Sequence, residues 1–138
     1  MRIVILIFVT FLVVSCQNQI SKQNDPADIA RAEVLASDFY KNLAKHNIDA
    51  IVTKTDSIDP EVAKKMILQK EQLNGEIIKV DFKSFSSTRT VTNGKNEKVE
   101  FIIEAEVSYA NGKTSEELNF VKYNSSQELL KFYHYHPI

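Results

Sequence analysis

The spacing of apolar residues changes at Gly75, from a period near 3.6 before it to a period of 2 after it. Residues 26–46 carry an apolar stripe with charged residues between its members, which predicts an amphipathic helix of about five turns. The stripe consists of Ile29, Ala32, Ala36, Phe39, Tyr40 and Leu43. Residues 99–109 alternate instead, which predicts a strand. Helices that precede strands in this way indicate an α+β fold.

Short signals mark the ends of the predicted helices. Asp-Pro occurs at 25–26 and again at 59–60, where Asp can accept backbone N–H bonds and Pro suits the first helical position. Gly75 ends the second of these helices, because glycine readily adopts the left-handed conformation. Residues 47–56 are expected to form a short helix or turn. The second long helix is expected to bury the stripe Val62, Met66, Ile67 and Leu73.

The second half of the chain predicts a sheet. Four strands are expected, at about residues 76–91, 96–110, 113–123 and 128–136. Asn93-Gly94 and Asn111-Gly112 lie between apolar runs and predict hairpins, because both residue types tolerate positive φ. The segment SFSST in the first strand suggests a bulge that curls the sheet. We therefore expect N-terminal helices packed on a curved, cone-shaped, four-stranded antiparallel meander, in one domain over 27–138.

The N-terminus has the layout of an export signal. Arg2 precedes an apolar run over 3–14, which is shorter than the 17 to 25 residues that a membrane-spanning helix needs, so we expect a signal peptide over 1–15. The residues Val13-Val14-Ser15-Cys16 resemble the bacterial lipobox, in which the cysteine receives diacylglycerol and becomes the first residue after cleavage. Residues 16–26 would then be the lipidated cysteine and a flexible tether.

Cys16 is the one cysteine of the chain, so a disulfide within the chain is excluded. The alternative to lipidation is a buried free thiol, but the polar residues that follow give this cysteine no core to enter. A lipid anchor would hold the domain permanently on the bacterial cell envelope, outside the cytoplasm. Gln17 stands where Asp often signals retention in the inner membrane, which favours the outer membrane.

Charge and motifs exclude several classes of function. Removal of residues 1–15 takes away Arg2 and lowers the net charge from −1 to −2, and no basic cluster remains that would bind nucleic acid. The sequence has no G-x-S-x-G nucleophile motif and no glycine-rich phosphate loop. We therefore expect no cofactor and assign no catalytic residue.

Two histidines in the last predicted strand are candidate metal ligands. His134 and His136 are two residues apart, so both side chains lie on the same face of that strand. They could bind Zn²⁺ or Cu²⁺ if His46 supplied a third ligand. The simpler interpretation, which we favour, is a solvated face at the end of the chain.

Tyrosines and acids suggest a ligand pocket as a second candidate. Tyr40, Tyr109 and Asp81 could line it, offering apolar rings, hydroxyl groups and a carboxylate. The alternative places both tyrosines at the edge of the core, because they lie on the stripes that define their elements. Glu104 and the pair Glu116-Glu117 are expected to be solvated.

The order of elements resembles the nuclear transport factor 2-like (cystatin-like) superfamily, and in particular small bacterial lipoproteins with such a domain. The resemblance covers about residues 27–136. It rests on Ala36, Phe39, Tyr40, Leu43 and Asp49, and on Val107, Tyr109, Asn111, Gly112, Glu117 and Leu118. Members commonly end with a tryptophan-containing strand, whereas this chain has no Trp. Enzymes of this fold use a carboxylate base and an oxyanion donor, and no residue here aligns with those roles.

These observations favour a non-catalytic binding or accessory module on the cell envelope. Its partners would be the membrane and either an envelope protein or a small apolar ligand. One alternative is a small enzyme or carrier that uses a cavity between the sheet and the long helix. Another is a structural subunit that dimerises through the outer sheet face around Ile102.

Lipidation is tested by metabolic labelling with palmitate. We expect label in the wild-type protein and none in Cys16→Ala, because the sulfur and the new amino terminus that carry the acyl chains belong to this residue. Equal labelling of both proteins would contradict the lipobox assignment.

Overall fold

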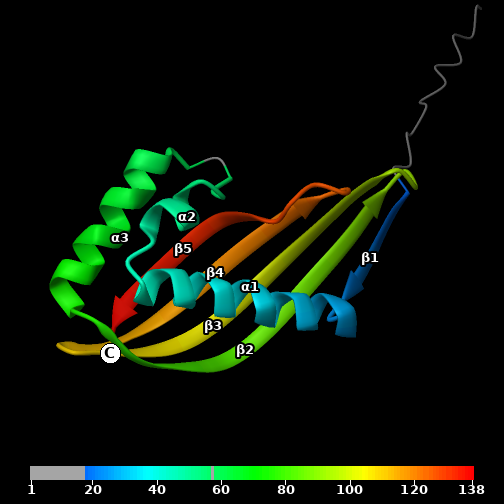
Figure 1. The fold of residues 1–138 in the computed structure, drawn as a ribbon. Helices are drawn as coiled ribbons and strands as arrows, with labels where there is room; N and C mark the ends of the chain where they lie inside the picture. Colours follow the sequence, from blue (N-terminus) through cyan, green and yellow to red (C-terminus); the bar gives the residue numbers. More distant parts are fainter. Residues whose placement is uncertain (1–17, 57) are drawn as a thin grey trace, which may run out of the picture.

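The computed structural model describes residues 18–138 except Ser57, so the expected signal peptide and Cys16 lie outside the described residues. The described part contains three helices and five strands (Figure 1). Their bounds are β1 Gln19–Gln23, α1 Pro26–Ala44, α2 Ile48–Val52, α3 Pro60–Asn74, β2 Ile77–Thr92, β3 Asn96–Tyr109, β4 Gly112–Tyr123 and β5 Leu129–Pro137. The expected α+β class is confirmed.

The strands form one antiparallel sheet in the order β1-β2-β3-β4-β5. The four predicted strands correspond to β2–β5, and the register between β2 and β3 shifts between Phe82 and Ser84, next to the bulge predicted at SFSST. The expected four-stranded sheet is wrong in one respect, because a fifth strand is present. Residues 19–23, expected to belong to a flexible tether, form β1 and pair with Thr88–Thr92 of β2. All five of its side chains are exposed, so no alternation in the sequence indicates this strand.

The helix starts follow the predicted signals. The Asp25 carboxylate accepts a hydrogen bond from Ala27 N at 2.9 Å, and the Asp59 carboxylate accepts one from Glu61 N at 2.8 Å. The helix α1 buries most of its predicted stripe against the sheet. Figure 1 shows α1 crossing one face of the sheet, with α2 and α3 at one end of it.

The predicted buried stripe of α3 is wrong in three of its four positions. Val62, Met66 and Leu73 are exposed, whereas the buried residues of α3 are Ala63, Ile67 and Lys70. The stripe was assigned to the wrong face of α3 because Lys70 occupies a position that faces the core, whereas larger apolar residues lie on the outer face. The helix therefore presents an apolar stripe to solvent.

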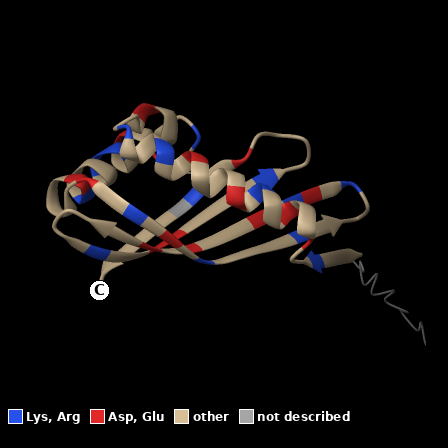
Figure 2. Cartoon of the chain, turned by 60° about the horizontal axis from the view of Figure 1, so that its bottom comes forward, with Lys and Arg blue, Asp and Glu red and all other residues tan. Residues whose placement is uncertain are grey.

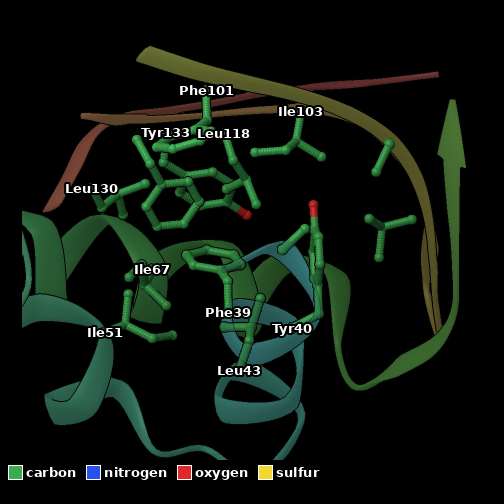
Figure 3. Packing of buried hydrophobic residues seen from close by; sticks show 14 of the residues in the cluster. Phe39, Tyr40, Leu43, Ile51, Ile67, Phe101, Ile103, Leu118, Leu130 and Tyr133 are labelled. Atoms are coloured by element: carbon green, nitrogen blue, oxygen red, sulfur yellow. The ribbon is translucent and has the colours of Figure 1, made fainter. Parts of the chain in front are cut away.

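One apolar core fills the space between the helices and the concave face of the sheet (Figure 3). Phe39, Leu43, Ile51 and Ile67 approach it from the helices. Acidic and basic residues are interspersed over the helices and the strands (Figure 2). Within the described part of the chain, no helix is both long and apolar enough to cross a membrane.

The two Asn-Gly hairpins differ in geometry. Asn93 and Gly94 have φ of 53° and 65°, as predicted for a tight turn between twisted strands. The β3–β4 turn is made by Ala110 and Asn111, and Tyr109 pairs with Gly112 across it. Neither Asn111 nor Gly112 has positive φ, so the hairpin is confirmed there and the expected left-handed geometry is wrong.

Two glycines provide a matched test of the backbone. Gly75 has φ 77° and ψ −160°, a region essentially restricted to glycine, and an added Cβ would lie 3.1 Å from Ala110 Cβ. We expect Gly75→Ala to lower the free energy of unfolding by about 2 kcal/mol in urea denaturation. Gly112→Ala is the control, because an added Cβ meets nothing within 4 Å and φ is not positive. Equal effects of both substitutions would contradict this account.

Candidate functional site

A lysine and a glutamate lie in contact, both buried, between α3 and the sheet. Lys70 of α3 is 1% exposed, Glu116 of β4 is 2% exposed, and their charged groups form an ion pair. Both residues occupy positions in their element that the spacing of buried residues directs toward the core. Lys70 follows Ala63 and Ile67 on the buried face of α3, and Glu116 precedes Leu118 in the inward-facing alternation of β4. We call these two residues and the hydroxyl groups around them the central cluster.

Four hydroxyl groups surround the Glu116 carboxylate. Tyr109 Oη donates to Oε1 at 2.7 Å, while Tyr40 Oη and Tyr133 Oη each donate to Oε2 at 3.0 Å. Thr114 Oγ1 also donates to Oε1. The donors come from α1, β3, β4 and β5, so the carboxylate joins one helix to three strands. Every acceptor position that a carboxylate offers is used.

Lys70 is equally well satisfied. Its three N–H groups donate to Glu116 Oε1, Tyr109 Oη and Tyr133 Oη. Its Nζ also lies over the rings of Tyr109, Tyr133 and Tyr135, at 4.6, 4.8 and 5.2 Å from their centroids. The ammonium group therefore has a negative partner, two hydroxyl acceptors and three aromatic faces.

Burial shifts the pKa values in the central cluster. Burial raises the pKa of Tyr40, Tyr109 and Tyr133 well above 10, and the Glu116 carboxylate raises these pKa values further. Burial lowers the pKa of Lys70, and Glu116 opposes that change. The tyrosines therefore remain protonated and act as hydrogen-bond donors at physiological pH.

The cluster resembles an acid–base site in composition but is sealed from solvent. Its tyrosines are between 4% and 7% exposed, and Figure 3 shows Tyr40 rising from α1 toward the sheet among packed apolar side chains. Each polar group already has its partners within the protein. As the structure stands, the central cluster fixes the arrangement of the core and offers no position to a substrate.

The structure brings together only part of the predicted pocket. Tyr40 and Tyr109 meet at Glu116, as a pocket would require. Asp81 does not join them, because its side chain is half exposed and pairs with Lys83 at 2.9 Å. The expectation that Glu116 is solvated is wrong. Its place in the alternating run Thr114, Glu116, Leu118 and Phe120 was the signal that could have identified it.

The histidines lie as predicted on one face of the last strand. The rings of His134 and His136 are 5.9 Å apart and line a hollow of about 240 Å³ on the outer sheet face with Glu104 and Glu117. His46 lies elsewhere, with Nδ1 3.4 Å from Glu71 of α3, so it does not complete a three-histidine set. Among the described residues, no group of three His, Cys, Asp or Glu side chains is placed to hold a metal ion.

An open groove of about 280 Å³ lies between α1, α2 and the β4–β5 turn. Apolar side chains form its floor and walls, namely Leu35, Phe39, Ala50, Ile51, Phe120 and Leu130. Arg31 of α1 and Glu128 of the turn close one side with two parallel hydrogen bonds of 2.9 Å each. This pairing lowers the pKa of Glu128 and raises that of Arg31, so both stay charged.

Two further charges line the groove. Asp38 comes from α1 and Lys54 follows α2. Within residues 18–138 other than Ser57, neither side chain forms an ion pair. A groove with an apolar floor and a few charged groups is typical of small-ligand sites. The sequence did not indicate this groove, because its residues come from four separate segments.

Comparison with known proteins adds no relative. No protein-family model, curated protein or solved structure matches the chain.

A double-mutant cycle tests the central cluster. Lys70→Met and Glu116→Gln should each lower the free energy of unfolding by about 3 kcal/mol, because each leaves a buried charge without its countercharge. The double variant should be more stable than the sum of the two losses predicts, by at least about 1 kcal/mol in urea denaturation.

The exposed pair Lys64 and Asp49 is the control for this cycle. Its atoms are 2.7 Å apart, but both side chains reach solvent, so Lys64→Met and Asp49→Asn should change stability little and additively. Strict additivity at Lys70 and Glu116 would show that the two side chains do not depend on each other.

Proposed function

We propose that this protein is a lipid-anchored component of the bacterial cell envelope whose domain binds an apolar ligand or partner segment without catalysing a reaction. The observation that carries the binding role is the groove between α1, α2 and the β4–β5 turn. It combines an apolar floor with two charges that form no ion pair in the described part of the chain. The anchor is Cys16, on the outer membrane, and the domain lies outside the cytoplasm.

The distribution of reactive groups supports binding rather than catalysis. The lysine, glutamate and tyrosines that could act as acid and base are buried in the central cluster and bonded to one another. In the groove, Arg31 and Glu128 hold each other in a bidentate pair. Asp38 and Lys54 can then select a ligand by its charge while the floor takes up its apolar part.

We further propose that the fold is the cone-shaped, cystatin-like one. Three helices precede a meander of four long strands, and register shifts in β2 at Ile77/Lys79 and Phe82/Ser84 support curvature of the sheet around α1. The additional strand β1 pairs at the edge and leaves this order unchanged.

The alternative role, dimerisation through the outer sheet face, has less support. Ile102 is 37% exposed on that face, but its surroundings are charged. Glu100 pairs with Lys98 and Lys131, and Glu104 accepts a hydrogen bond from Ser84 at 2.7 Å. A single apolar side chain among ion pairs provides little area for a stable dimer.

Fluorescence titration with 8-anilinonaphthalene-1-sulfonate tests the groove, because this probe has apolar rings and one negative charge. The protein is residues 17–138, which contain every described helix and strand. We expect saturable binding that Lys54→Glu weakens about fivefold, since a favourable charge contact becomes a repulsion. Ala50→Phe should abolish it by filling the groove.

The control is Lys65→Glu, an equally exposed charge reversal on α3 that does not line the groove. It should leave the affinity unchanged, and the urea midpoints of all variants should agree. Binding that Lys65→Glu weakens as much as Lys54→Glu does, or no binding by the wild type, would contradict the proposed site.

A further inference from the structure

The chain enters the fold at one end of the sheet. Asn93 N donates to Asn18 O at 2.8 Å, and Gln19 pairs with Thr92. The first described residues are therefore fixed beside the β2–β3 turn, and Figure 1 shows the start of β1 next to this turn. The β4–β5 turn is at the same end, because Asn124 N donates to Glu97 O at 2.8 Å. We call residues 18–20, 93–96 and 123–126 the anchor end.

The connection from Cys16 to the anchor end is short. Two peptide units separate Cys16 from Asn18, and an extended chain spans at most about 3.6 Å per residue. The Cα atoms of two residues this close in any chain are at most about 7 Å apart, so a lipid on Cys16 would be attached close to Asn18. A free tether over residues 17–24 would have let the domain turn in any direction, but β1 takes up most of those residues.

The surface of the anchor end suits a lipid headgroup layer. Ile20 is 70% exposed and Tyr123 is 42% exposed. Lys95 lies in the exposed β2–β3 turn and forms no ion pair within the described residues. Amphipathic tyrosines are enriched at membrane interfaces, and lysines are attracted to anionic lipids.

We propose that the anchor end lies against the membrane surface and that the long axis of the sheet points away from it. This inference rests on the proposed lipidation of Cys16. The strand β3 spans 14 residues, so the β3–β4 turn would lie about 40 Å farther from the bilayer. The exposed apolar residues Leu73 and Ile78 belong to that far end and would face away from the membrane.

Two single-cysteine variants test the orientation. Asn96→Cys and Asn111→Cys change the same residue type at exposed positions beside the β2–β3 and β3–β4 turns. Because lipid occupies the sulfur of Cys16, each variant offers one free thiol for a nitrobenzoxadiazole fluorophore. The lipidated full-length protein is reconstituted in phosphatidylcholine–phosphatidylglycerol vesicles that contain a headgroup-nitroxide lipid, which quenches only at short range.

We expect quenching at position 96 to exceed that at position 111 at least threefold. Ser125→Cys, an exposed position in the β4–β5 turn of the anchor end, should behave like Asn96→Cys and serves as a second label at this end should one variant misfold. Equal quenching at the two ends, in protein whose intact mass includes the lipid, would overturn the orientation and leave the anchor intact. An intact mass without lipid would refute the anchor and the orientation together.

A linker insertion tests whether the short connection between Cys16 and β1 causes the orientation of the domain. Eight Gly and Ser residues inserted between Gln17 and Asn18 should reduce the difference in quenching between positions 96 and 111 to less than half. A difference that survives the insertion unchanged would overturn the assignment of the orientation to the short connection.

Discussion

The buried contact between Lys70 and Glu116 determines how the helices lie on the sheet. The helix α3 buries few side chains, and apart from Lys70 these are the small Ala63 and the single large aliphatic Ile67. Apolar burial of this extent would allow the helix to slide or rotate. A buried lysine favours one position of the helix, in which its ammonium group reaches Glu116 and two tyrosine hydroxyls. The pair thus specifies the packing, although burying it contributes little net stability.

Because of the same contact, the polar groups buried between α3 and the sheet are not open to a ligand. The cluster contains an acid and hydroxyl donors, which are the groups that acid–base catalysis uses. Lys70 lies against Glu116 and the tyrosine hydroxyls and takes up their hydrogen-bonding capacity. The open groove then forms farther along α1, where Arg31 and Glu128 hold the β4–β5 turn at a distance from the helix.

The sequence predicted the elements that bury an apolar face with a regular period. The helix α1 and the strands β3 and β4 were found because their stripes and alternation carry the core. The strand β2 was found from its alternating sequence, although its one buried residue is Ser87. The strand β1 was missed because its backbone pairs while all its side chains are exposed, so no pattern of residue types reports it. The stripe of α3 was assigned to the wrong face because hydrophobicity placed Met66 inside and Lys70 outside. Lys70 can be buried because Glu116 of β4 lies next to it, and this contact between distant parts of the chain is visible only in the folded structure.

The β4–β5 turn belongs both to the anchor end and to the wall of the groove. Gln127 and Glu128 line the groove and immediately follow the part of this turn that belongs to the anchor end. From that turn the groove extends along α1 to Ala50 and Ile51 of α2, so it runs from the anchor end toward the helices at the other end of the sheet. Its floor includes Phe39, Phe120 and Leu130. Because β1 joins the sheet within a few residues of Cys16, an anchor at that residue would limit both the distance and the direction of the groove from the membrane.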